Sequence, residues 1–385
     1  MITLEEYLNS KIQLNKNKNL NIIKLFFSNS DLLELSSKSI AVVGTNGKTS
    51  TANYLYKIFI SESKNTLLFT SPHLVNFSER IKSNRNIELS NYLYDLLKFE
   101  KDNNITLGYF EALFLISTKV FLDNNFQYYI CEAGIGGKFD TTSLLQSKNV
   151  ILTNIGYDHT ELLGCTLEEI LDQKIFISDI IENLFIGEED RNLLSNIKNN
   201  YQHFKNIYHL RDFLVSNSLD VAKLLANDKN YFLALMSATR ILNKEFQTNT
   251  LNFEEKFVQG RFEVVSKDPL KILDGAHNIS GVKSFFRDLE LSFNDFEFDI
   301  YLGFKEGKDY LDILDFLISK DFVNFKIIEQ NTFFKQENPL HIEDYLKKYG
   351  KKYEKIQLEH FLENNNPSIL LGSLYLIGEY KKRNL

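Results

Sequence analysis

The chain has 385 residues, of which 43% are hydrophobic and 25% are charged, and its formal net charge is −7 at pH 7. This length allows two or three domains with real hydrophobic cores, and the composition excludes a mainly disordered protein. A negative net charge without a dense block of lysine and arginine disfavours a protein that grips nucleic acid.

The N-terminal residues include Glu5 and Glu6 and lack the apolar core of a signal peptide. The most apolar later run, residues 112–122, contains Lys119 and is too short to span a bilayer. The two cysteines, Cys131 and Cys165, do not form a C-x-x-C pair, and so few thiols are typical of a reducing compartment. We therefore expect a cytoplasmic protein that acts as a monomer and has no membrane or nucleic-acid partner.

A strand followed by a glycine loop and a helix is the most informative element. Residues 40–43 are small or β-branched and apolar, and residues 51–60 carry apolar side chains on one helical face. The loop between them consists of Gly44, Thr45, Asn46, Gly47, Lys48, Thr49 and Ser50. Its glycines let backbone N–H groups converge on phosphate oxygens, the helix start adds positive potential, and Lys48 supplies a charge for the terminal phosphates. We expect this loop to bind ATP, with the Thr49 or Ser50 hydroxyl facing magnesium.

Strand-like and helix-like segments alternate over residues 39–160. Further strands are expected at 66–69, 128–131 and 150–155, with a helix around 108–122. Such alternation predicts a mostly parallel sheet with helices on both faces. Ligands of such sheets bind beyond the carboxyl ends of the strands.

Polar residues follow several of these expected strands. Ser71 follows residues 66–69, Glu132 begins a glycine-rich turn after 128–131, and His159 follows 150–155. Glu111 lies in the first turn of an otherwise apolar helix, where the helix dipole favours an acid. An imidazole and carboxylates close to buried strands suit a hard cation whose remaining ligands are phosphate oxygens. On the residues alone, a purely structural role for each stays open.

A second alternation begins after a short glycine-bearing segment around Gly260. Strands are expected at 271–273, 298–303, 325–328 and 368–371, and helices at 280–291, 310–317, 342–349 and 373–382. The sequence thus predicts an α/β protein: an N-terminal P-loop ATPase-like doubly wound sheet over 1–265 and a smaller, C-terminal Rossmann-like domain over 266–385. Residues 274–278 follow a strand of the second sheet, so we expect the nucleotide to be held between the domains.

Seven segments occur in the order typical of one family: 44–49 (GTNGKT), 70–74 (TSPHL), 78–81 (SERI), 110–112 (FEA), 158–160 (DHT), 260–263 (GRFE) and 274–278 (DGAHN). In these segments the chain resembles the folylpolyglutamate synthase/dihydrofolate synthase family of Mur-ligase-like, ATP-dependent amide ligases. The SPHL and SERI motifs point to the folate branch. Only 43 residues precede Gly44, so we do not expect the extra N-terminal domain of ligases that act on UDP-linked precursors.

The resemblance implies roles for individual residues. Lys48 and the loop would hold the β- and γ-phosphates of ATP. Thr49, Ser71 and Glu111 would gather around one magnesium ion. His159 would hold a second magnesium ion, with Glu111 near both.

The family also implies roles for residues further along the chain. Lys174, at the end of an expected helix over 167–174, matches a position that the family commonly carries as a carbamate. Ile175 and Phe176 replace the more usual alanine and glycine after it. Arg261, Asp274 and His277 would contact ATP, Arg261 through phosphate.

The expected reaction follows from this chemistry. A carboxylate would take the γ-phosphoryl group of ATP to become an acyl phosphate, and the amine of L-glutamate would then displace phosphate. The acceptor would be dihydropteroate, tetrahydrofolate or both. Two alternatives stay open: another Mur-like amide ligase with a different carboxylate acceptor, and a non-catalytic ATP-binding switch.

Overall fold

The computed structural model describes residues 2–12, 19–201, 204–251, 258–293, 297–306, 310–320, 323–329 and 337–383. The chain forms two compact units. The first comprises Met1–Ser71 and Phe77–Lys256, and the second comprises Pro72–Asn76 and Phe257–Leu385. The sequence suggests a boundary further along the chain, at 265/266, and does not anticipate that Pro72–Asn76 packs with the second unit.

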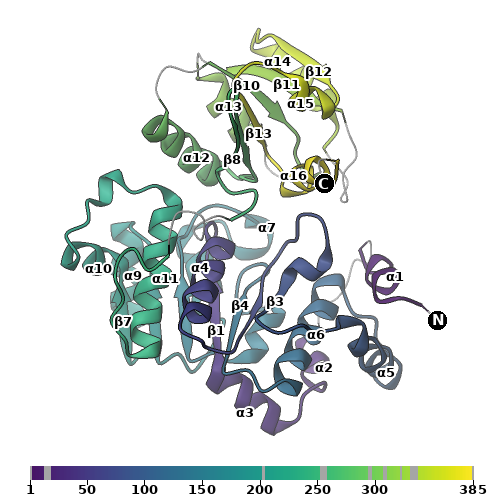
Figure 1. The fold of residues 1–385 in the computed structure, drawn as a ribbon, viewed down its shortest axis with the longest axis vertical. Helices are drawn as coiled ribbons and strands as arrows, with labels where there is room; N and C mark the ends of the chain where they lie inside the picture. Colours follow the sequence, from purple (N-terminus) through teal and green to yellow (C-terminus); the bar gives the residue numbers. More distant parts are fainter. Residues whose placement is uncertain are drawn as a thin grey trace. The chain divides into compact units, whose positions relative to one another are not determined.

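Within its described residues, the first unit has one sheet of seven strands in the order β3-β2-β4-β1-β5-β6-β7 (Figure 1). Neighbouring strands are parallel except β2 and β3, which are antiparallel. The strands are β1 (Ser39–Val43), β2 (Thr66–Phe69), β3 (Ile81–Ser83), β4 (Tyr128–Glu132), β5 (Asn149–Leu152), β6 (Asn183–Ile186) and β7 (Asn206–His209).

Helices cover both faces of this sheet. They are α1 (Leu4–Asn9), α2 (Leu20–Lys24), α3 (Asn29–Lys38), α4 (Lys48–Ser61), α5 (Leu93–Asn103), α6 (Tyr109–Asp123), α7 (Thr160–Leu163), α8 (Leu167–Ile175), α9 (Arg191–Asn200), α10 (Leu210–Ser216) and α11 (Ala226–Leu242), with 3₁₀ turns η1 (Phe77–Arg80), η2 (Leu89–Tyr92), η3 (Thr141–Leu145) and η4 (Val221–Lys223). Alternate strand residues such as Ala41 and Cys131 pack towards α8 and α6. The helices α4 and α11 lie side by side (Figure 1).

Two features of the first unit differ from the sequence expectation. The strand expected over 150–155 ends at Leu152, because Asn154 and Gly156 form hydrogen bonds with the phosphate loop instead of continuing the sheet. Strand β3 beside β2 and strands β6 and β7 beyond β5 also belong to the sheet, and the sequence does not predict these three strands. The alternation of strands and helices, and with it the mostly parallel sheet, is confirmed.

The second unit contains a sheet of six strands, within the part of the chain that is described, in the order β12-β11-β10-β13-β9-β8. Among these described strands, only β8 and β9 pair antiparallel. The strands are β8 (Glu263–Lys267), β9 (Leu270–Asp274), β10 (Phe298–Leu302), β11 (Val323–Ile328), β12 (Tyr353–Ile356) and β13 (Ser368–Leu371), and the helices are α12 (Ile279–Ser292), α13 (Leu311–Ile318), α14 (Pro339–Lys348), α15 (Glu359–Glu363) and α16 (Leu374–Arg383). The two-sheet α/β architecture is the one that the sequence predicts.

The segment Pro72–Asn76 packs within the second unit through its backbone and through Leu74. A β-carbon on Gly378 of α16 would lie 2.0 Å from the Leu74 carbonyl oxygen, so this close approach requires glycine. The Leu74 side chain packs on an apolar cluster that includes Leu374 and Ile377. Only Thr70 and Ser71 separate this segment from β2, yet its packing belongs to the other unit.

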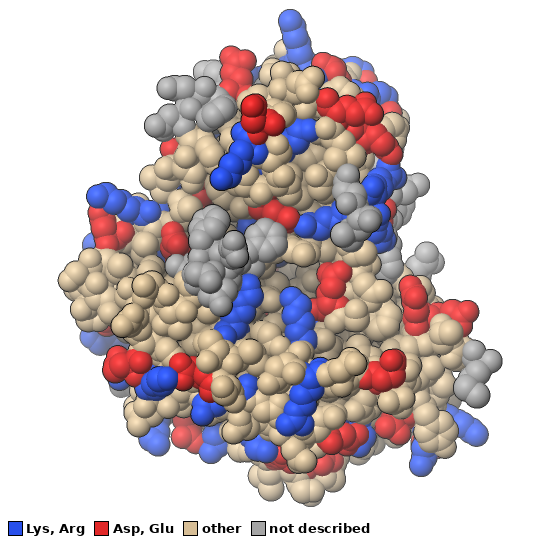
Figure 2. Space-filling model, viewed as in Figure 1, with Lys and Arg blue, Asp and Glu red and all other residues tan. Residues whose placement is uncertain are grey.

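The apolar run that the sequence shows around residues 112–122 forms a core helix. It lies in α6, where every residue from Ala112 to Thr118 is buried, and its apolar side chains share a core with Leu67 of β2 and Tyr129 of β4. Among the described residues, no helix combines the length and the apolar character needed to cross a membrane. Figure 2 shows lysine and arginine side chains next to aspartate and glutamate over the visible face.

Candidate active site

The phosphate loop joins β1 to α4 through two glycines with positive φ angles. Gly44 has a φ of +146°, and Gly47, which directly precedes α4, has a φ of +83°. A β-carbon on Gly44 would lie 1.8 Å from Thr153 Oγ1. A β-carbon on Gly47 would lie 2.4 Å from Asn230 Oδ1. Both positions therefore require glycine, and the backbone of the loop runs close to its neighbours.

The segment after β5 holds the phosphate loop in place. Thr45 N donates to Asn154 O at 2.8 Å, and Asn46 N donates to Asn154 Oδ1 at 2.9 Å. Thr45 Oγ1 donates to Gly156 O and accepts from Gly156 N, both at 3.0 Å. Thr153 Oγ1 donates to Asn46 O at 2.6 Å. These bonds order the loop in advance, which lowers the entropic cost of binding an anion there.

Lys48 is the first residue of α4, and its ammonium group lies against the phosphate loop. Its Nζ atom donates to the carbonyl oxygens of Gly44 and Thr45, each at 3.1 Å. Phosphate oxygens accept stronger hydrogen bonds from an ammonium than neutral carbonyl oxygens do. The first N–H groups of this 14-residue helix have no acceptor within the helix and add to its positive end. Lys48 is thus well placed to neutralise an anion at the loop.

Glu132 connects the phosphate loop with the segment that follows β2. Its carboxylate, in a residue that is 1% exposed, accepts from Thr49 Oγ1 at 2.8 Å and from Ser71 N at 3.0 Å. Glu132 is the last residue of β4, which lies between β2 and β1 in the sheet. Thr49 follows β1 and Ser71 follows β2. The order of the strands therefore brings all three residues together at the carboxyl ends of the sheet.

The sequence assigns the metal-binding carboxylate to Glu111, whereas the structure puts Glu132 against Thr49 and Ser71. Glu111 lies in the first turn of α6, and its Oε2 atom would be 1.8 Å from a β-carbon on Gly108, the residue before the helix. A carboxylate folded over a helix start is stabilised by the positive end of the helix dipole. The sequence marks Glu132 as one of several polar residues that follow an expected strand, and only the strand order identifies its contacts with Thr49 and Ser71.

Lys174 is a buried lysine that also contacts the phosphate loop. It is 4% exposed, and its Nζ atom donates to Gly44 O at 2.9 Å. The pKa of Lys174 is lowered from 10.5 to about 7, mainly by burial and secondly by the positive charge of Lys48. The carboxylates of Asp158 and Asp140 oppose this shift. A substantial fraction of the amine is therefore neutral near pH 7, and a neutral amine is a nucleophile.

The glycine-rich turn after β4 fixes the end of α8, which carries Lys174. A β-carbon on Gly137 would lie 2.6 Å from the carbonyl oxygens of both Gln173 and Lys174. Lys138 N donates to Gln173 O at 2.7 Å. Because the two backbones approach so closely, position 137 requires glycine. The turn thus sets the position of the Lys174 backbone.

His159 follows β5 and precedes α7, with a φ of +53°. Its Nε2 atom lies 3.7 Å from Asp158 Oδ1, and its Nδ1 atom lies 3.6 Å from Glu161 Oε1. Across the described residues, no three histidine, cysteine, aspartate or glutamate side chains gather as a preformed metal site. Magnesium commonly takes one or two protein ligands and completes its shell with water and phosphate oxygens. The donors at Glu132 and His159 fit that mode of binding.

Sequence reasoning missed Asn230, on α11. Its amide group borders Gly47 of the phosphate loop. The helix is held beside α4 by contacts such as that of Tyr54 with Tyr231, whose ring centres are 6.0 Å apart. A side-chain amide there can donate to or accept from a bound nucleotide. The local sequence of α11 carries no mark that distinguishes this asparagine.

In the second unit, Asp274 is the last residue of β9, Arg261 lies in the segment before β8, and His277 lies in the segment after β9. Asp274 accepts from Phe262 N and Ala276 N, both at 2.7 Å. Burial raises the pKa of Asp274, and Arg261 and the two N–H groups oppose that shift. His277 Nδ1 lies 2.8 Å from the carbonyl oxygen two residues before it. The Asp274 carboxylate thus connects the segment before β8 with the segment after β9 through hydrogen bonds.

Comparison with known proteins relates this site to a family. The model of the Mur ligase middle domain matches residues 42–210. The dihydrofolate synthase/folylpolyglutamate synthase of Buchnera aphidicola from Acyrthosiphon pisum is 28% identical over 404 residues, which cover 96% of this chain and 95% of that protein. The dihydrofolate synthetase of Saccharomyces cerevisiae is 25% identical, covering 89% of this chain and 92% of that protein.

Solved structures have the same fold. E. coli FolC in complex with ADP has a TM-score of 0.79 at 20% identity, covering 99% of this chain and 97% of that chain. A bifunctional folylpolyglutamate synthase/dihydrofolate synthase with Mn, AMPPNP and L-glutamate bound has a TM-score of 0.76 at 20% identity, and the match covers 100% of this chain and 98% of that chain. The chain is thus similar, in its ordered motifs and along most of its length, to members of the folylpolyglutamate synthase/dihydrofolate synthase family, and it has the fold of their solved structures.

Proposed function

We propose that the chain is an ATP-dependent ligase that joins the amino group of L-glutamate to a carboxylate of dihydropteroate or of a folate. One observation carries this proposal: the rigid phosphate loop, the Glu132 carboxylate and the buried Lys174 amine meet at the carboxyl ends of one parallel sheet. Relatives named dihydrofolate synthase/folylpolyglutamate synthase match this chain along most of its length, and related structures contain DHPP and ADP or AMPPNP and L-glutamate.

The phosphate loop would serve the first half of the reaction. Lys48 and the N–H groups at the start of α4 would hold the phosphates of ATP, and the ammonium would stay close to the charge that moves during phosphoryl transfer. A free carboxylate is a poor electrophile, so it would first accept the γ-phosphoryl group and become an acyl phosphate. The glutamate amine would then form the C–N bond and lose a proton, and phosphate would leave with the electrons of the broken C–O bond.

We assign one divalent metal site to Thr49, Ser71 and Glu132 and a second to His159. Glu132 takes the place of Glu111 in this assignment because of its hydrogen bonds to Thr49 and Ser71. When bound, Mg²⁺ or Mn²⁺ would neutralise the charge of the phosphates. Hydroxyl, carboxylate and imidazole groups are suitable donors for these ions.

We also propose that Lys174 is carbamylated in the active protein. The neutral amine would attack CO₂, forming an N–C bond and releasing one proton, and the lysine would change from a cation to an anion. Its pKa of about 7 supports this step, because the amine need not be deprotonated at an alkaline pH first. The carbamate oxygens would supply metal or water ligands that an ammonium cannot.

The proposal also includes a role in ATP binding for three residues of the second unit, Arg261, Asp274 and His277. A guanidinium such as that of Arg261 binds phosphate with two parallel hydrogen bonds. The hydrogen bonds of Asp274 to Phe262 N and Ala276 N would keep the two loops of the second unit in a fixed arrangement. We propose that these loops contact ATP.

The decisive test is a ligation assay with the full-length protein, ATP and labelled L-glutamate. Dihydropteroate and tetrahydrofolate are offered separately, and labelled amide, ADP and phosphate are measured. We expect one ADP and one phosphate for each amide formed with at least one acceptor. ATP binding without any amide product would instead support a non-catalytic switch, and amide formation with only unrelated carboxylates would support another Mur-like ligase.

A further inference from the structure

The turn that carries Arg261 has an unusual backbone conformation. Gly260 and Phe262, the residues on either side of Arg261, have φ angles of +68° and +45°. Glycine adopts a positive φ readily, whereas a bulky residue such as phenylalanine does so only when its surroundings hold it there. Arg261 N also donates to Val258 O at 3.2 Å, which closes the turn. The direction in which the Arg261 side chain leaves the backbone therefore depends on the groups that hold this turn.

Two buried carboxylates hold the turn, one on each side of Arg261. On one side, Phe262 N donates to Asp274 Oδ2 at 2.7 Å. On the other side, Gly260 N donates to Glu263 Oε2 at 2.6 Å. Glu263 is the first residue of β8 and is 5% exposed. Hydrogen bonds to a carboxylate are stronger than those between neutral groups, so both sides of the turn are fixed.

The charge of Glu263 is matched by a lysine of the C-terminal helix. Lys381, in the last turn of α16, donates through Nζ to Glu263 Oε1 at 2.7 Å. The side chains of Lys381 and Glu263 are only 16% and 6% exposed, so water screens their attraction weakly. Removing one partner of such a pair leaves an uncompensated charge. Lys382, the next residue, pairs instead with Glu379 at 3.1 Å, and its side chain is 38% exposed.

The face of α16 that carries Lys381 also packs on the turn. A β-carbon on Gly260 would lie 3.2 Å from Leu374 Cδ2 and 3.6 Å from Ile377 Cδ1. Leu374, Ile377 and Lys381 are spaced by three and four residues, so they lie on one face of the helix. Helix α16 thus contacts the turn through apolar side chains and through the ion pair of Lys381 with Glu263.

We propose that Lys381 and Glu263 are positioning residues for Arg261, and that the last turn of the C-terminal helix thereby determines how well the protein uses ATP. The inference rests on the proposed function, in which Arg261 binds a phosphate of ATP, and it extends that function to two residues that act through Arg261. A guanidinium forms two parallel hydrogen bonds with phosphate only from a defined direction. Without Lys381, the Glu263 carboxylate would turn towards water, Gly260 N would lose its acceptor, and Arg261 would adopt the binding direction less often.

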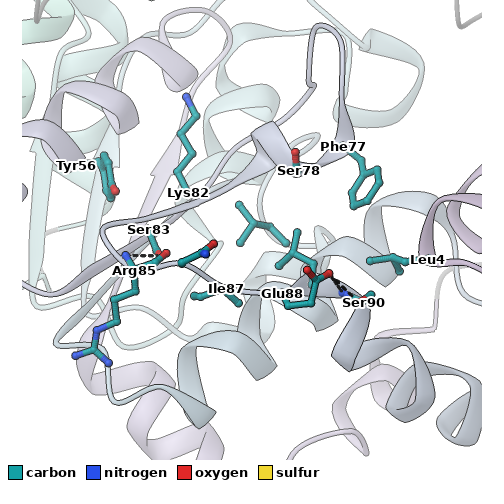
Figure 3. Close-up of a pocket in the computed structure, with 13 residues that line it drawn as sticks. Leu4, Tyr56, Phe77, Ser78, Lys82, Ser83, Arg85, Ile87, Glu88 and Ser90 are labelled. Carbon is teal, nitrogen blue, oxygen red and sulfur yellow. Dashed lines mark hydrogen bonds between the residues drawn. The ribbon is translucent and has the colours of Figure 1, made fainter.

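The expected effect is specific to the nucleotide. Every residue that lines the cavity of about 600 Å³ beside β3 belongs to the first unit, including Tyr56, Lys82 and Arg85 (Figure 3). Lys381 and Glu263 belong to the second unit. A change at Lys381 therefore leaves the lining of that cavity intact. A loss confined to ATP distinguishes a misplaced Arg261 from a general disturbance of the fold.

The test measures kcat and KM for ATP, for L-glutamate and for the carboxylate acceptor with the full-length protein. We expect Lys381→Met to lower kcat/KM for ATP about 10-fold, the effect of losing one hydrogen bond to a charged group. The KM values for L-glutamate and for the acceptor should stay at their native values. Lys381→Arg keeps the charge and should restore most of the native kcat/KM. Lys382→Met removes the same charge from the neighbouring position and is the matched control, which should leave kcat/KM for ATP unchanged.

A double variant shows whether Lys381 acts through Arg261. In Arg261→Met there is no guanidinium left to position, so adding Lys381→Met should lower kcat/KM for ATP no further. A purely structural role would lower it equally in both backgrounds. If Lys381→Met does not fold, Glu263→Gln is compared in the same way, because it removes the charge and keeps one acceptor oxygen.

Three outcomes overturn the inference: a native kcat/KM for ATP in folded Lys381→Met, a loss of the same size in the Arg261→Met background, or an equal rise in KM for all three substrates. If the native protein forms no amide with any acceptor, the proposed function is refuted, and calorimetric binding of AMPPNP decides the inference separately. Binding that is about 10-fold weaker in Lys381→Met than in the native protein would support the inference, and equal affinity would overturn it.

Discussion

Lys48 and Lys174 donate hydrogen bonds to the same atom, the carbonyl oxygen of Gly44, at 3.1 and 2.9 Å. Two ammonium groups on one acceptor repel each other, and the buried one gives up its proton more readily. The charge of Lys48 is accordingly the second cause, after burial, of the lowered pKa of Lys174. Carbamylation would convert this repulsion into an attraction and so link the end of α8 to the phosphate loop.

Replacing Lys174 by alanine removes the proposed carbamate. We expect ligation to fall roughly 100-fold or more, as when a group that stabilises transition-state charge is lost. A small carboxylic acid added to the assay should restore part of the activity by supplying oxygen ligands. Carbon-13 NMR of the native protein equilibrated with labelled bicarbonate should show one carbamate resonance that Lys174→Ala lacks. Its absence from an active native protein contradicts carbamylation.

The stability of the protein should depend on pH through Lys174. Its pKa is about 7 in the folded state and 10.5 as the ordinary value, so between these pH values the unfolded chain binds more protons. The free energy of unfolding should therefore rise with pH from 7 towards 10.5, by at most about 1.4 kcal/mol per pH unit from this group. Urea unfolding in CO₂-free buffer checks this. Lys174→Met should lack the rise, and identical pH profiles of the two proteins would argue against a shifted pKa.

Lys48→Met should separate the two effects of the Lys48 charge. Ligation should be lost, because the phosphates lose their ammonium partner, while the fold is kept. The pKa of Lys174 should rise, because the positive charge of Lys48, the second cause of its lowered value, is removed. The carbamate resonance should then require a higher pH than in the native protein. An unchanged pH dependence of that resonance would show that the two lysines are not coupled.

Glu132→Gln and Glu111→Gln distinguish the two candidate metal-binding carboxylates. We expect Glu132→Gln to need at least about 10-fold more Mg²⁺ for half-maximal ligation. Replacing even a residue that only hydrogen-bonds to a metal ligand lowers metal affinity by at least about that factor. Glu111→Gln should change the Mg²⁺ requirement less. Mg²⁺ titrations of ligation by both variants provide the measurement. A larger effect at Glu111 would restore the assignment made from the sequence.

Asp274→Ala tests the loops of the second unit. The change leaves Phe262 N and Ala276 N without their acceptor, which costs about 1–3 kcal/mol per unsatisfied buried group. We expect a lower thermal midpoint and a higher KM for ATP. Asp274→Asn retains one acceptor oxygen and should lie between the native protein and Asp274→Ala. A KM for ATP that stays at the native value in both variants would contradict the proposed role in ATP use.

Local patterns were sufficient to predict the phosphate loop and most strands. Gly44 and Gly47 mark positive φ angles, and the apolar runs beside them mark a buried strand and helix. Strand order was not predictable in the same way, because it depends on contacts between distant segments. Glu132 is the clearest case: its contacts follow from the position of β4 between β1 and β2.

Other parts of the site had weak or absent signals. The strand β7 is only half-buried and carries mixed residues, so neither an alternating nor a continuous apolar pattern marks it. Asn230 contacts the phosphate loop only because α11 packs beside α4. The expected roles of Lys174, Arg261 and His277 came from the family resemblance, since a single lysine, arginine or histidine predicts no chemistry by itself.

The packing of Pro72–Asn76 has a consequence for recombination among relatives. The chain leaves one unit for the other after Ser71, after Asn76 and after Lys256, so a single crossover near residue 256 does not exchange a complete unit. A chimera made that way would set the Leu74 of one parent on the Gly378 and α16 of another, where the approach leaves no room for a β-carbon. Functional chimeras should therefore inherit residues 72–76 and the C-terminal unit from the same parent.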